Sequence, residues 1–146
     1  MALAAPSPAS TALRWRGARA PLFTATGLGL VAVALRFRDP HRHASWGLCP
    51  FKALTGWDCP GCGGLRAVND LGHGQLGAAW HSNALFIALL PLVAVLWSGW
   101  LVGSWSGRRR RLPDTVVRYG AIGFVLLAVA FTVFRNTPAG SAWFAT

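Results

Sequence analysis

Three long apolar runs dominate the pattern of hydrophobic and polar positions along the chain. They cover residues 20–37, 84–103 and 119–134, and Arg36 is the one charged side chain inside them. At the rise of an α-helix these runs extend for roughly 27, 30 and 24 Å, close to the thickness of a hydrocarbon core. Lipid offers backbone polar groups no partner, so helices are the expected form. The pattern predicts an all-α integral membrane protein with three transmembrane helices.

The more polar segments between the runs divide the chain further. We expect a basic N-terminal tail, a Cys- and His-containing interfacial segment, a basic loop and a C-terminal tail, at residues 1–19, 38–83, 104–118 and 135–146. Within the interfacial segment, residues 65–71 predict a short amphipathic helix, and residues 75–82 predict a helical approach to the second run. The segment is therefore expected to form an interfacial loop and short helix between spans one and two.

Composition supports the membrane interpretation and excludes two other classes of protein. Of the 146 residues 53% are hydrophobic and 12% charged, against roughly 25% charged in a soluble domain. A disordered chain would also be far less apolar. The net charge of +10 comes from arginines at the ends of the runs, where such side chains snorkel to lipid headgroups; Arg118 and Arg135 are expected to do so around the third run. The lipid bilayer is therefore the expected partner, with a membrane protein or a second copy as further candidates, and nucleic acid is not expected.

Basic residues in the loops favour an orientation with the N-terminus in the cytoplasm. That orientation places eight basic residues inside: Arg14, Arg16, Arg19, Arg108, Arg109, Arg110, Arg111 and Arg118. It leaves six outside: Arg36, Arg38, Arg42, Lys52, Arg66 and Arg135. A cleaved signal peptide is disfavoured, because Arg36 and Arg38 would follow the cleavage site directly.

All three cysteines lie in the interfacial segment, and four interpretations of them stay open. The first is a metal site for zinc, in which Cys49, Cys59 and Cys62 bind the ion and His73, His81, His41 or His43 completes the ligand set. The second is thiol–disulfide chemistry of Cys59 and Cys62, with Cys49 as resolving thiol. A structural disulfide from Cys49 and simple packing of small side chains are the third and fourth.

Catalytic motifs give little support to an enzyme. The sequence has no serine nucleophile elbow, phosphate-binding loop or HExxH helix, and four acidic residues in all. We therefore favour a non-enzymatic role. Gly63, Arg66 and Asn83 are expected to be structural, with Arg66 spaced to pair with Asp70 along one helix face.

Several spaced motifs resemble one known family. Cys49-Pro50, Thr55-Gly56, Cys59-Pro60-Gly61-Cys62-Gly63, Arg66-Ala67, Gly74, Ala79 and Asn83 resemble the bacterial domain-of-unknown-function 2752 family of small membrane proteins, over residues 47–103. The chain departs from the family pattern at Leu65, Gln75 and Ala84. The resemblance implies a multi-pass protein of the bacterial cell membrane and supplies no activity.

These observations predict a small multi-pass membrane module whose cap is stabilised by its cysteines, through packing or a bound metal. The alternative is a membrane thiol–disulfide component that uses Cys59 and Cys62.

Overall fold

The computed structural model describes residues 8–42, 46, 49–107 and 112–144. Every regular element in these ranges is a helix, and none of the described residues forms a strand. The helices are α1 (Pro8–Phe37), α2 (Pro50–Thr55), α3 (Gly64–Gly72), α4 (Leu76–Ser82), α5 (Ala84–Ser106), α6 (Asp114–Arg135) and α7 (Pro138–Trp143). The predicted all-α fold class is confirmed.

Three of the helices are long and apolar enough to cross a membrane, as predicted. They are the part of α1 from Arg14 to Phe37, the whole of α5 and the whole of α6, with 24, 23 and 22 residues. Only 11% of the most apolar window of α1 and 6% of that of α5 is buried, and none of that of α6. The apolar side chains thus face outwards, as a bilayer requires.

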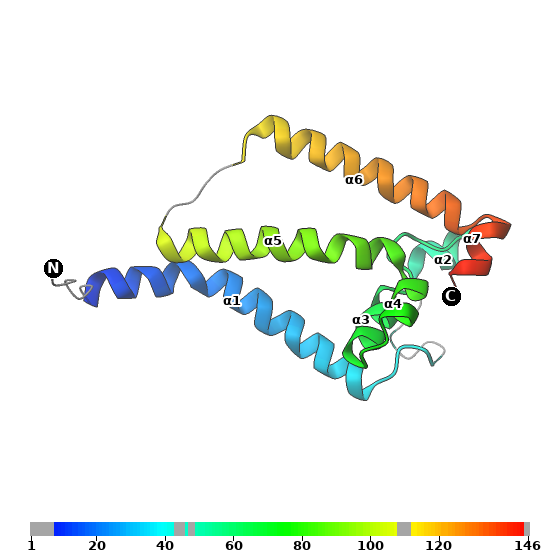
Figure 1. Ribbon diagram of the computed structural model, residues 1–146, viewed down its shortest axis with the longest axis horizontal. Helices are drawn as coiled ribbons and strands as arrows, with labels where there is room; N and C mark the ends of the chain where they lie inside the picture. The colour runs from blue at the N-terminus through cyan, green and yellow to red at the C-terminus, as the bar shows by residue number, and fades with distance from the viewer. Residues whose placement is uncertain (1–7, 43–45, 47–48, 108–111, 145–146) are drawn as a thin grey trace.

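The short helices gather at one end of the molecule, where α6 approaches α5, whereas α1 meets α5 at the opposite end and diverges from it towards the short helices (Figure 1). We call residues 49–83, which contain α2, α3 and α4, the cap; α7 lies beside it. Helix α5 runs between α1 and α6. Helix α1 contains Pro21 and bends in its N-terminal half (Figure 1), since proline removes one helical hydrogen bond.

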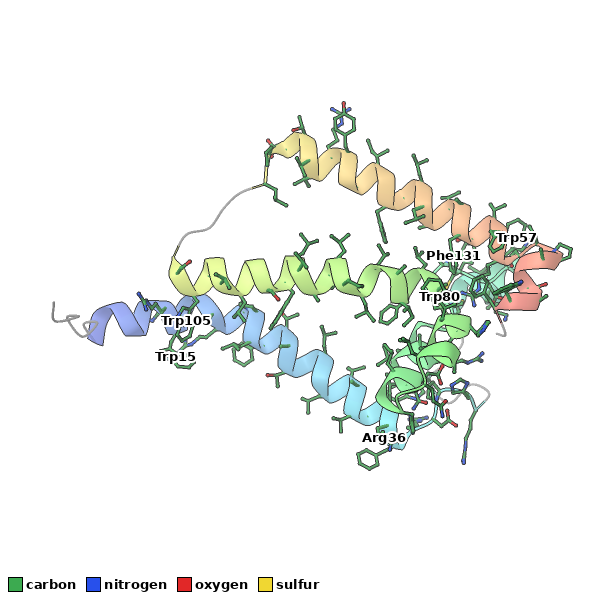
Figure 2. All side chains as sticks on the ribbon, in the orientation of Figure 1. Trp15, Arg36, Trp57, Trp80, Trp105 and Phe131 are labelled. Carbon is green, nitrogen blue, oxygen red and sulfur yellow. The ribbon has the colours of Figure 1, made fainter. Side chains whose placement is uncertain are left out.

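Helices α1 and α5 are packed together at the end of the molecule opposite the cap. The rings of Trp15 and Trp105 meet edge to face with centroids 5.0 Å apart (Figure 2). Gly17 on α1 lies against the backbone of Ser104 on α5, with no room for a Cβ atom. Glycine is therefore required for this crossing.

The cap meets the end of α1 through a buried hydrogen bond. Asn69 on α3 donates its Nδ2–H to the carbonyl of Leu35, at 2.7 Å. Helices α3 and α4 occupy the segments in which short helices are predicted, whereas α2 and α7 were not predicted. The cap is thus a helical layer attached to the ends of the long helices.

Candidate metal centre

The three cysteine side chains form one cluster at the edge of the cap. Their Sγ atoms all lie within 4.8 Å of one another. Cys59 Sγ is 2.8 Å from Cys62 Sγ and 3.4 Å from Cys49 Sγ. All three are free thiols, each half-buried. The structure therefore brings together the three cysteines that the sequence singles out.

The cysteines come from two separate backbone features. Cys49 is the N-cap residue of α2. Cys59 and Cys62 lie on a tight turn, in which Cys62 N–H donates to Cys59 O at 3.1 Å and Cys59 N–H donates to Cys62 Sγ at 3.2 Å. We call residues 59–63 the cysteine turn. The Cys59 N–H favours a thiolate at Cys62, which is the form that binds metal, although burial has the larger effect on that thiol.

Gly63 ends the cysteine turn in a conformation that other residues rarely adopt. Its φ is +80°, and it is the N-cap residue of α3. A Cβ atom at this position would collide with the carbonyl of Ser82, at the end of α4. Gly63 therefore allows α3 to start directly after the turn while the end of α4 passes against it.

Asn83 joins the cysteine turn to the start of α5. Its side chain is 1% exposed. Its Nδ2 donates to Pro60 O at 2.9 Å and to Cys62 O at 3.1 Å, and its Oδ1 accepts from Phe86 N–H at 2.9 Å. One side chain thus caps a membrane helix and holds the turn that carries two of the thiols.

Arg135 joins the end of α6 to the same turn, and the prediction that it snorkels to headgroups is wrong. It is 1% exposed, and its Nη1 donates to Cys62 O at 2.7 Å. The rings of Phe131 and Phe144 lie 5.7 and 5.8 Å from its guanidinium carbon; Figure 2 shows Phe131 at the cap end of α6. Sequence reasoning missed this residue, because an arginine after an apolar run is typical of an interfacial anchor.

The residue after it, Asn136, makes a second connection. Its Oδ1 accepts from Asp58 N–H at 2.9 Å, and its Nδ2 donates to Asp58 O at 3.0 Å. The Asp58 carboxylate in turn pairs with Lys52 Nζ at 2.8 Å. The end of α6 therefore holds the cysteine turn itself through Arg135 and the residue before the turn, Asp58, through Asn136.

The pKa values of two thiols are shifted in opposite directions. The N–H of Lys52, at the start of α2, donates to Cys49 Sγ and lowers the pKa of that thiol. Burial raises the pKa of Cys62 to about 12, and the neighbouring Cys59 and Cys49 thiols add to the shift. Cys49 is thus the better nucleophile, while Cys62 keeps its proton in the absence of a metal.

The histidines named as candidate fourth ligands are bonded elsewhere. His73 Nδ1 lies 2.8 Å from Asn69 O, and His81 Nδ1 lies 3.0 Å from Trp143 O. His41 Nε2 pairs with the buried carboxylate of Asp70 at 2.9 Å. Among the described residues, the ligand group comprises the three cysteines; His43 lies outside those residues.

The remaining predicted structural residue, Arg66, attaches α3 to the segment after α1. Its Nε donates to Pro40 O at 3.4 Å. The Asp70 carboxylate, in addition to His41, accepts a hydrogen bond from Ser82 Oγ at 2.7 Å. Arg66 and Asp70 therefore both serve the packing of the cap on its neighbours.

Comparison with known proteins supports the predicted family resemblance. Residues 49–97 match the family described as "Protein of unknown function (DUF2752)", which confirms the resemblance carried by the cysteine motif. The match contains all three cysteines and ends within α5, so that Arg135 and Asn136 lie outside it. Comparisons with curated proteins and with solved structures found no match.

Proposed function

We propose that the protein is a non-enzymatic membrane module in which Cys49, Cys59 and Cys62 bind one thiophilic metal ion, zinc being the candidate. The observation that carries the proposal is the separation of the three Sγ atoms, all within 4.8 Å. Sulfur ligands 2.3 Å from a tetrahedral zinc ion stand roughly 3.8 Å apart. The separations of 2.8 and 3.4 Å between Cys59 and its two neighbours are short enough for small side-chain rotations to reach that geometry. Water is the fourth ligand in this proposal.

A metal ion would supply stability that the cap does not obtain from apolar burial. The apolar side chains buried in the cap are those of Ala67 and Ala79, which are among the smallest available. A segment with so small a core needs a cross-link or a metal to hold its shape. Binding energy at a structural zinc site contributes directly to folding.

The cap is proposed to lie on the outer side of a bacterial cell membrane, with the N-terminus in the cytoplasm. This orientation rests on the distribution of basic residues along the chain.

The metal proposal is tested by zinc analysis of the full chain purified in detergent, together with a thiol count with and without reductant. We expect one zinc ion per chain and three thiols that react only after chelation. Cys59→Ser should lose the zinc. His73→Ala and His81→Ala are matched controls that should keep it; loss of zinc in either would contradict water as the fourth ligand.

A second candidate function is thiol–disulfide exchange by Cys59 and Cys62, favoured by the 2.8 Å contact between their sulfur atoms. In that reaction the two thiols are oxidised to a disulfide, while a disulfide of a partner protein takes up both electrons and both protons and becomes two thiols. The high pKa of Cys62 makes it a poor leaving group for the reverse step, so the metal is the better supported function. A reversible Cys59–Cys62 disulfide in protein without zinc would reverse that ranking.

A further inference from the structure

The Arg135 guanidinium lies buried next to the thiol cluster with most of its donors unused. Nη1 donates to Cys62 O, but no described residue accepts a hydrogen bond from Nε or Nη2. A guanidinium keeps its charge under all physiological conditions. A buried charge of this kind is costly unless an opposite charge lies close by. The surroundings of Arg135 must therefore supply negative charge.

Among the described residues, the carboxylate that interacts with Arg135 does not supply enough negative charge to balance it. It belongs to Asp58, whose Oδ1 is already 2.8 Å from the ammonium group of Lys52. Arg66 adds further positive charge to the same region. The Asp58 carboxylate is thus shared between Lys52 and Arg135.

The other groups that interact electrostatically with Arg135 are the thiols of Cys59 and Cys62. Protonated thiols are neutral and leave the positive charge uncompensated. Three thiolates around a divalent ion carry one net negative charge, which is the charge that Arg135 balances.

We infer that Arg135 is the counter-ion of the metal centre and that the site is matched to a divalent thiophilic ion bound by three thiolates and a neutral water. The inference rests on the proposed metal-binding function and adds the charge of the ion and a positioning residue from the third membrane helix. Arg135 touches the backbone of Cys62 rather than the metal, so it acts by orienting the cysteine turn and neutralising the centre.

The charge of Arg135 is tested by comparing zinc affinity among three variants of the full chain in detergent, by competition with a chelator of known affinity. Arg135→Gln should weaken zinc binding about 10- to 100-fold, as for other residues that support metal ligands. Arg135→Lys keeps the charge and should recover most of this loss. Arg118→Gln removes an exposed arginine near the start of α6, at the other end from the cap, and should bind zinc within about threefold of wild type.

Cobalt(II) spectra and the behaviour of the zinc-free proteins separate a loss of charge from misfolding. The sulfur-to-cobalt charge-transfer band should persist in Arg135→Gln at saturating cobalt, and each variant should elute as a single species on gel filtration. Wild-type affinity in Arg135→Gln, or an equal loss in Arg135→Gln and Arg135→Lys, would overturn the inference and leave the proposed function intact. Absence of divalent-ion binding by the wild-type protein would instead overturn the proposed function.

Discussion

Cys49 and Cys62 contribute sulfur atoms to the same cluster but lie in different electrostatic surroundings. The backbone N–H of Lys52 stabilises the Cys49 thiolate, whereas burial and the neighbouring thiols stabilise the protonated form of Cys62. A metal ion must displace the proton from Cys62 when it binds. Zinc affinity should therefore fall as the pH falls.

This difference predicts the order in which the thiols react in the zinc-free protein. A thiol with a lowered pKa forms thiolate at lower pH, so Cys49 should be alkylated by iodoacetamide well before Cys62 at pH 8. Because the pKa of Cys62 is about 12, its alkylation rate should rise about tenfold for each pH unit up to that value. Mass spectrometry of the alkylated peptides measures both rates. Equal rates at pH 8 would contradict the assignment of pKa shifts, and prior addition of zinc should protect both thiols.

Gly63 and Gly64 are adjacent, yet we expect opposite responses to substitution by alanine. Gly63→Ala would force a Cβ into a left-handed conformation and against the Ser82 carbonyl, which should destabilise the protein by about 1–3 kcal/mol. Gly64 begins α3, and a Cβ there meets no atom within 4 Å, so Gly64→Ala should be neutral or slightly stabilising. Thermal unfolding in detergent, read with the zinc content, compares the two. An equal loss in both variants would show that the turn geometry is not the cause.

At the level of elements, the continuous apolar runs predicted the three long helices. The amphipathic pattern of the cap segment predicted the two short helices α3 and α4. The six-residue helices α2 and α7 were missed because each begins with a proline and is too short to show a helical period. The interpretation of Arg135 failed for a related reason. Its burial depends on Phe144, at the end of α7. The chain turns back between the two residues, and the sequence around Arg135 carries no pattern that predicts this contact.

The start of α5 depends on Asn83 for both its cap and its connection to the cysteine turn. Asn83→Ala removes the acceptor for Phe86 N–H and both donors to the turn, and should cost about 1 kcal/mol for the cap plus about 1 kcal/mol for each hydrogen bond to the turn. Asn83→Ser keeps a capping oxygen but cannot reach the turn, so it should recover only the stability that the cap contributes. Stability and zinc affinity in detergent test both variants; full recovery by serine would mean that the contacts with the turn contribute nothing.

On the scale of the whole molecule, the cap is where the three membrane helices are joined. Asn69 holds the end of α1, Asn83 the start of α5, and Arg135 and Asn136 the end of α6. Two of these four connections lead to the carbonyl of Cys62. A metal ion bound at the cysteine turn would therefore fix the relative positions of α5 and α6, helices whose apolar surfaces face almost entirely outwards.

The burial of Arg135 also changes the number of basic residues on each side of the membrane, on which the proposed orientation rests. With Arg135 enclosed by protein, five basic residues remain on the side of the cap: Arg36, Arg38, Arg42, Lys52 and Arg66. The opposite side keeps its eight, and the larger difference favours an N-terminus in the cytoplasm and a cap outside.

This orientation predicts from which side of the membrane a single cysteine can be labelled. In a chain carrying Cys59→Ser and Cys62→Ser, Cys49 should react with a membrane-impermeant maleimide in intact cells of an expression host. Ser106→Cys, made together with Cys49→Ser in the same background, places the thiol at the far end of α5 and should react only after the cells are permeabilised. The reverse pattern would place the cap in the cytoplasm, where the proposed metal site would lie in a reducing compartment. Labelling of both positions in intact cells would show that α5 does not cross the membrane, because its two ends would then lie on the same side.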